Sequence, residues 1–269
     1  MQKENLHTHT VFSDGRNSPR ELVDRALELG FTALGFSDHS YTSIDTEYCM
    51  KREVLARYQK IVRSLSEEYA GKLRIPFGIE QDYFSDDPPA GFDYVIGSVH
   101  YVVKDGQCLP VDKSPRDFIK NILRCYAGDV FAFCRDYYAL VRGVAEKTDA
   151  DVIGHFDLIG KFNEGDRLFD PEDKRYTDPA IDAADALLET GLPFEINTGA
   201  MARGYRSSPY PSEKLIEYIA SRGGRFILSS DCHDAELLDY GFSEIEEKYG
   251  RYLITSESIR FKKHENPGL

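Results

Sequence analysis

The 269-residue chain predicts a single-domain α/β fold with parallel strands. Seven short apolar runs alternate with segments of helical spacing, which is the pattern of successive strand–helix–strand units. The length is typical of one α/β barrel, and no low-complexity or Pro/Gly-rich linker divides the chain. In addition, histidine or acidic residues end the apolar runs. Because the carboxyl ends of parallel strands meet on one face, we expect these side chains to share one site.

The first strand is predicted at residues 6–10, which contain His7 and His9 and precede the motif Ser13-Asp14-Gly15. Side chains alternate along a strand, so two histidines separated by one residue point to the same side. That geometry suits one metal ion. A single His-x-His pair is also compatible with two surface histidines, so this interpretation depends on the other histidines.

Six further apolar runs end in a histidine or an acid. They are 33–39 with Asp38-His39, 75–80 with Glu80, 94–100 with His100, 152–157 with His155-x-Asp157, 193–197 with Glu195-Ile196-Asn197, and 226–233 with Asp231-Cys232-His233. Histidines placed for packing alone would not recur at the same end of successive strands. Of the seven histidines, only His264 lies elsewhere. It is expected to be an ordinary surface residue in a charged tail, 256–269, that frays.

Caps and apolar spacing predict helices between the strands. They cover the segments from Ser18-Pro19 to Gly30, about 51–69, 114–148 with a break near Gly128, Asp178-Pro179 to Gly191, and Ser212 to Gly223. About twelve residues separate the third and fourth strands, too few for a crossover helix, so the barrel is expected to be irregular there. The polar segment 161–179 is expected to be a long surface loop.

Composition narrows the possible partners. The formal net charge of −13 disfavours a nucleic-acid partner, because phosphate backbones require clustered basic residues. No apolar stretch approaches the roughly 18 residues of a membrane span, and the first residues contain no apolar signal core, so we expect a cytoplasmic protein without a membrane partner.

Five cysteines without a Cys-x-x-Cys pair argue against a disulfide framework or thiolate zinc site. The oligomeric state stays open.

Imidazole and carboxylate ligands without thiolate indicate Zn²⁺, Mn²⁺ or Fe²⁺. The candidates exceed the capacity of one ion, so two or three divalent ions are expected, with a bridging carboxylate. They are six histidines together with Asp14, Asp38, Glu80 and Asp231. Ions roughly 3.5–4 Å apart activate water and stabilise both the attacking and the leaving oxygen of a displacement. The chain has no Gly-x-Ser-x-Gly elbow and no Gly-rich phosphate loop. The sequence therefore favours metal-dependent hydrolysis.

In their order along residues 6–234, these motifs resemble the polymerase-and-histidinol-phosphatase (PHP) family. The resemblance implies a distorted (β/α)7 barrel with a trinuclear site at the carboxyl ends of the strands. It also implies three ligand sets: His7, His9, Glu80 and Asp231 for the first ion; Glu80, His100 and His155 for the second; Asp14, His39 and His233 for the third. Asp38 is expected to orient a histidine rather than to bind an ion.

Within the family, the chain is most similar to the histidinol-phosphate phosphatases, by its length and its stretches at 154–159 and 195–198. The resemblance implies hydrolysis of L-histidinol phosphate to L-histidinol and inorganic phosphate, a step of histidine biosynthesis. Arg203 and Lys161 lie where the family carries phosphate-binding arginines, and they are predicted to bind substrate, with Asn197 as a further polar contact. Asp231 or His233 is predicted to protonate the leaving alkoxide. Acids in the 161–179 loop are expected to face the amine and imidazole of the substrate.

Two alternatives remain. The chain could hydrolyse another small phosphate ester, such as a nucleotide or sugar phosphate; its acidic surface disfavours an oligonucleotide end. It could also be a non-catalytic binding module stabilised by metal. The complete ligand set argues against the module, because decayed relatives should have lost histidines or acids.

Overall fold

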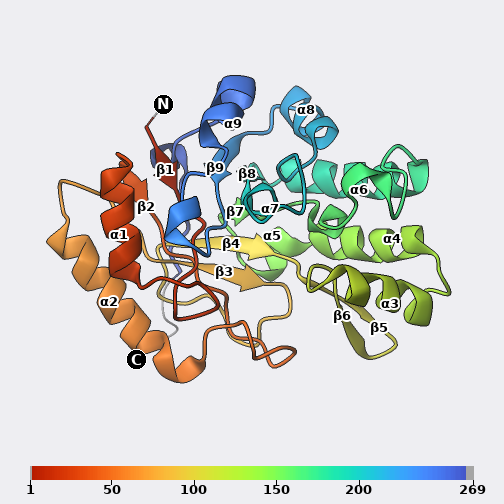
Figure 1. Ribbon diagram of the computed structural model, residues 1–269, viewed down its shortest axis with the longest axis horizontal. Helices are drawn as coiled ribbons and strands as arrows, with labels where there is room; N and C mark the ends of the chain where they lie inside the picture. The colour runs from red at the N-terminus through yellow and green to blue at the C-terminus, as the bar shows by residue number, and fades with distance from the viewer. Residues whose placement is uncertain (1, 265–269) are drawn as a thin grey trace.

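Seven parallel strand segments form the centre of the protein (Figure 1). The computed structural model describes residues 2–264. Five strands make one sheet, in the order β3 (Gly78–Asp82), β4 (Tyr94–Ser98), β7 (Val152–Ile153), β8 (Phe194–Asn197) and β9 (Phe226–Ser229). A second parallel pair contains β1 (Glu4–Asn5) and β2 (Ala33–Leu34).

Isolated parallel bridges join the two sheets into a ring. Thr8 pairs with Cys232, which links the chain after β1 to the chain after β9. On the other side, Phe36 pairs with Phe77, and His39 pairs with Glu80, which links the chain after β2 to β3. The seven segments therefore form the predicted α/β barrel. It is distorted, because β1, β2 and β7 are only two residues long.

The barrel interior is filled by the ring of Tyr94, which is fully buried and donates a hydrogen bond to the Leu6 carbonyl (2.5 Å). A Cβ atom at Gly78 would lie 2.2 Å from this ring, and one at Gly35 would lie 2.3 Å from its hydroxyl. Only glycine fits at these two positions, because a side chain there would overlap with the tyrosine.

Helices cover the barrel, with α1 and α2 on one side and α3, α4 and α6 on the opposite side (Figure 1). The long ones are α1 (Pro19–Glu28), α2 (Leu55–Glu68), α3 (Pro115–Cys125), α4 (Val130–Val141), α6 (Lys174–Leu188), α8 (Glu213–Ser221) and α9 (Phe242–Tyr249). Two short helices are α5 (Val144–Lys147) and α7 (Gly199–Ala202), and 3₁₀ turns cover 52–54, 158–160, 164–166, 235–237, 250–252 and 256–258. As predicted, Ser18 caps α1. No described helix is both long and apolar enough to cross a membrane.

The segment between β7 and α6 differs from the prediction. Helix α6 begins at Lys174 instead of Asp178, because the Asp173 side chain caps it by accepting a hydrogen bond from the Arg175 N–H (2.8 Å). Pro179 lies inside the helix. The polar loop is therefore shorter than expected. As predicted, no helix connects β3 and β4.

An antiparallel hairpin after β4 was not predicted. It consists of β5 (Tyr101–Lys104) and β6 (Gln107–Pro110), with Asp105 and Gly106 at positive φ in its turn. Asp-Gly between two apolar runs is a hairpin signal, so the sequence carried the information. The hairpin places Tyr101 beside the carboxyl ends of the barrel strands.

The chain near residue 264 is packed against the amino end of the barrel, contrary to the expected frayed tail. His264 is buried, and its Nε2 atom lies 2.7 Å from Oδ2 of Asp151, which is also buried. The same carboxylate accepts hydrogen bonds from the backbone N–H groups of Val95 (2.9 Å) and Lys262 (2.7 Å). The expectation of a surface histidine is wrong, because this acid gives it a buried partner. The rest of the predicted tail, 265–269, lies outside the described residues.

Asp151→Ala is expected to lower the free energy of unfolding by about 2–4 kcal/mol, because it leaves a buried strand N–H and a buried histidine without their acceptor. Urea denaturation measures the change. Lys263→Ala, at an exposed position nearby, is the control and should change stability by less than about 0.5 kcal/mol. Equal midpoints for the two variants would contradict the assigned role of Asp151.

Candidate metal centre

Nine side chains meet at the carboxyl ends of the barrel strands, and all nine were predicted as ligands. They are His7, His9, Asp14, His39, Glu80, His100, His155, Asp231 and His233. All of them are buried except Asp14 and His233, which border solvent. Alternation along the strands explains the convergence, because each strand end directs its ligand to the same face.

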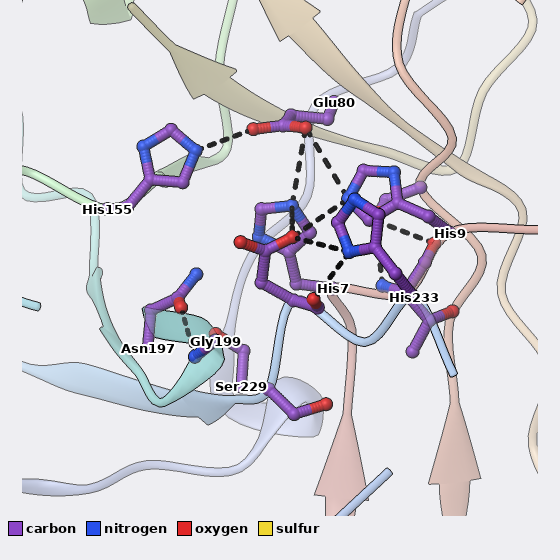
Figure 2. Close-up of polar contacts among 12 residues, drawn as sticks. His7, His9, Glu80, His155, Asn197, Gly199, Ser229 and His233 are labelled. Carbon is purple, nitrogen blue, oxygen red and sulfur yellow. Dashed lines mark hydrogen bonds and ion pairs between the residues drawn. The ribbon is translucent and has the colours of Figure 1, made fainter. Parts of the chain in front are cut away.

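Glu80 is the centre of this group. Figure 2 shows its carboxylate between His155 on one side and His7, His9 and His233 on the other. Five imidazoles lie close to its two oxygens: His39 Nδ1 (2.7 Å), His155 Nε2 (2.8 Å), His7 Nε2 (3.4 Å), His100 Nε2 (3.4 Å) and His9 Nε2 (3.6 Å). A carboxylate with ligands on both sides is suited to bridging two ions.

Three groups of ligand atoms are compact enough to hold an ion, with every pair of atoms within 4.8 Å. They are His7, His9 and Glu80; His39, Glu80 and His100; and His9, Asp14, His39 and His233. Asp231 adjoins the first group, with Oδ1 lying 3.1 Å from His9 Nε2. These groups overlap the sets that the resemblance implies but differ from them: the second contains His39 and not His155, which lies 2.8 Å from Glu80 Oε1, and the third also contains His9.

Asp231 and His233 reach the site through an unusual backbone conformation. Asp231 has a φ of 48°, in the left-handed region that aspartate tolerates better than most residues. This turn keeps Cys232 in the parallel ladder with Thr8, while the acid and the histidine on either side of it face the other ligands.

The electrostatics of the cluster favour cations. Several buried polar atoms lie near other ligand atoms but make no hydrogen bond of normal geometry among the described residues: His7 Nε2, both ring nitrogens of His9, Glu80 Oε2 and His155 Nδ1. Burial, and then His39 and His233, lower the pKa of His9 to about 3, so this imidazole is neutral and can donate a lone pair. Burial opposes protonation of His7, but Glu195, Glu80 and Asp231 outweigh it and raise its pKa. Divalent ions would complete this set of atoms and supply the positive charge.

Two acids behind the ligands were missed as functional residues. Glu195 accepts hydrogen bonds from Ser229 Oγ (2.9 Å) and the His155 N–H (3.0 Å), and its Oε1 lies 2.7 Å from His7 Nδ1. Asp82 Oδ2 lies 2.9 Å from His100 Nδ1. Such carboxylates orient the histidines that bind metal. For Asp82 a signal was available, because it follows Glu80 by two residues in a strand.

Asp38, which was expected to orient a histidine, has another role. Its carboxylate accepts hydrogen bonds from the Thr10 N–H (2.8 Å) and from Ser13 Oγ (2.5 Å). It therefore holds the loop that carries Asp14, and the expectation is wrong because the loop donors occupy its oxygens.

A cavity of about 500 Å³ opens beside the ligands. Arg203 and Lys161 both line it. Arg203 Nη2 bonds to Asp231 Oδ2 (2.9 Å), and Lys161 Nζ bonds to Asp112 Oδ2 (3.2 Å). Burial opposes ionisation of Asp231, but Arg203 and then His7 hold its pKa well below the ordinary value. The carboxylate is therefore ionised.

Two predicted substrate contacts do not face this cavity. Asn197 is fully buried and donates to Glu195 Oε2 (3.3 Å). It also accepts a hydrogen bond from the Gly199 N–H (2.9 Å), the contact drawn in Figure 2. It supports Glu195 instead. Among the described residues, the acids lining the cavity besides the ligands are Asp45, Glu47 and Asp112, and none comes from the 161–179 loop.

Glu195→Gln should weaken metal binding by about 10–100-fold, because the amide orients His7 less strongly than a carboxylate does. Metal content after dialysis against graded chelator, measured by elemental analysis, gives the shift. Glu189→Gln, at an exposed position after α6, should retain the wild-type content. Identical metal retention in both variants would exclude the orienting role of Glu195.

Known proteins resemble this chain along most of its length. A family model described as the PHP domain matches residues 5–199. A protein of Deinococcus radiodurans named "Probable histidinol-phosphatase" is 32% identical over 249 residues, which cover 88% of this chain and 89% of that protein. The histidinol-phosphatase of Bacillus subtilis is 26% identical, over 92% of this chain and 100% of its own length.

A solved structure has the same fold. It is the histidinol phosphate phosphatase of Lactococcus lactis in complex with zinc, L-histidinol and phosphate, and it aligns with a TM-score of 0.68 and 20% identity over 98% of both chains. The family model covers more than half of the sequence, and the Deinococcus relative covers almost all of it. The chain belongs to the PHP family.

Proposed function

We propose that this protein is a metal-dependent phosphomonoesterase that hydrolyses L-histidinol phosphate to L-histidinol and inorganic phosphate. The observation that carries the proposal is the shared cavity, which is lined by imidazole and carboxylate ligands together with Arg203 and Lys161. The names of the Deinococcus and Bacillus relatives, and the ligands of the Lactococcus structure, support this reaction.

The ligand groups are suited to two or three divalent ions of Zn²⁺, Mn²⁺ or Fe²⁺. His7, His9, Glu80 and Asp231 would hold the first; Glu80, His100 and His155, with His39 nearby, the second; Asp14, His39 and His233 the third. When bound, such ions neutralise phosphate charge and lower the pKa of water. Asp82 and Glu195 fix the ligand orientations.

Arg203 binds the phosphate oxygens, and its planar guanidinium is held in place by Asp231. Lys161, which lines the same cavity, supplies a second cation. Its ammonium group donates to the carbonyl (2.9 Å) and carboxylate of Asp112, which fixes its position. Both residues therefore orient the phosphate for attack by water.

Asp231 or His233 transfers the proton. The attacking water releases a proton as the new P–O bond forms, and one of these two side chains delivers a proton to the leaving alkoxide as the ester P–O bond breaks. The sum is ester plus water giving alcohol plus phosphate. His233 lies beside Asp231, with its Nδ1 3.5 Å from Oδ1, and it helps to hold the reacting groups.

Phosphate release should be measured with L-histidinol phosphate and phenyl phosphate, using protein that has been chelated and then reloaded with Mn²⁺ or Zn²⁺. We expect a kcat/KM for L-histidinol phosphate several orders of magnitude above that for phenyl phosphate, and no turnover after chelation. Slow and equal turnover of both esters would retain the phosphoesterase and exclude the substrate. Absence of turnover with either metal would exclude the enzyme.

Arg203→Ala should lower kcat/KM about 10–100-fold, because a charge-assisted hydrogen bond to phosphate contributes about 1.5–3 kcal/mol. Inhibition by inorganic phosphate should weaken as well, which separates phosphate binding from a general loss of activity. Arg222→Ala, on the exposed end of α8, is the matched control. Unchanged kinetics in Arg203→Ala would remove this residue from the site.

A further inference from the structure

The hydroxyl of Tyr48 is a polar group that the proposed reaction does not use. Tyr48 lines the cavity, and its buried Oη atom makes no hydrogen bond of normal geometry to the described residues, although the neighbouring Tyr101 side chain is close enough to affect its pKa. An unpaired buried hydroxyl is unfavourable, because it has lost its hydrogen bonds to water without replacing them. Bound cations would account for the unpaired ligand atoms of the metal centre. They would not account for the Tyr48 hydroxyl, because a phenol that keeps its proton is a hydrogen-bond donor.

The loop that carries Tyr48 is firmly held. Its ends are joined by a hydrogen bond from the Met50 N–H to the His39 carbonyl (3.0 Å). Asp86 accepts a hydrogen bond from the Ser43 N–H (2.5 Å), and Asp45 bonds to Lys113 (3.2 Å) beyond the hairpin. These contacts therefore fix the position of the Tyr48 ring.

Tyr48 faces the metal centre from the side of the hairpin. Its ring packs edge-on against His39, with centroids 4.7 Å apart, and lies 6.3 Å from the rings of both His100 and Tyr101. Arg203 instead contacts Asp231 and His233, from the loop after β9. The two residues thus border different parts of the cavity.

The charges near Tyr48 disfavour phosphate. Burial, and then Asp82, raise the pKa of Tyr48, so the hydroxyl remains a donor. Asp45 and Asp112 line the same wall, and the charge of Asp112 is already matched by Lys161. A phosphate dianion is repelled by such acids, whereas an uncharged or cationic group is accepted.

We infer that Tyr48 is a specificity-determining residue that donates a hydrogen bond to the leaving group of the substrate, on the wall formed by the 40–50 loop and the hairpin. This inference rests on the proposed function. The acceptor is an uncharged heteroaromatic nitrogen: above pH 7 an imidazole is largely neutral and offers one such atom. The tilted Tyr101 ring beside Tyr48 adds a second aromatic side chain to this wall, which suits a planar group.

Tyr48→Phe tests this, because it removes the hydroxyl and retains the ring against His39. At pH 8, kcat/KM for L-histidinol phosphate should fall about 3–10-fold, the effect of one neutral hydrogen bond. The inhibition constant of L-histidinol should rise by a similar factor. Turnover of phenyl phosphate, whose ring has no acceptor, and inhibition by inorganic phosphate should stay within about twofold. Metal content and circular dichroism confirm that the variant is loaded and folded.

Tyr41→Phe is the matched control, since Tyr41 lies in the same loop but stacks on Arg52 (4.0 Å) outside the cavity. An equal loss on both esters, or full retention of the preference for L-histidinol phosphate, would overturn the inference and leave the proposed function intact. A wild-type enzyme without that preference would overturn the proposed function, and the inference with it.

Discussion

The structure depends on one buried negative charge, the carboxylate of Glu80. A carboxylate that is 1% exposed is stable only when hydrogen-bond donors or cations surround it, and five imidazoles from four strand ends lie within 3.6 Å of its oxygens. Apart from His7 and His9, which share one segment, those imidazoles come from different parts of the chain. A barrel of parallel strands meets this requirement, because it directs the ends of all its strands to one point.

A second layer of side chains, behind the histidines that surround Glu80, fixes the orientation of those histidines. Glu195 and Asp82 fix the far nitrogens of His7 and His100, so the near nitrogens point to the centre. Arg203 balances Asp231 in the same way at the border with the cavity. Charge is thus paired outward from the centre, and several buried polar atoms of the described residues that have no hydrogen bond lie where a cation would bind, among them His7 Nε2 and both ring nitrogens of His9. The paired atoms therefore hold the site in shape, and the unpaired atoms are available to bind a cation or a substrate group.

The sequence allowed much of this to be predicted, because period-two alternation and strand ends are local features. They led to the nine side chains that meet at the strand ends and to the parallel α/β fold. The supporting role of Glu195 was harder to predict from the sequence, because this residue lies within an apolar run and its partners Ser229 and His155 are distant in sequence. His264 was misjudged for the same reason, since its partner Asp151 is separated from it by more than a hundred residues. The start of α6 was missed because two capping aspartates, Asp173 and Asp178, compete in sequence, and packing decides between them.

The bridge between Thr8 and Cys232 has a consequence for synthesis of the chain. The first strand contributes His7 and His9, whereas Asp231 and His233 come from the last. Contacts of such large sequence separation form late, because the intervening chain must first be ordered. On the ribosome, the amino-terminal ligands emerge more than two hundred residues before their partners. The histidine pair is therefore exposed throughout elongation, and the complete centre can assemble only after the final strand has been released.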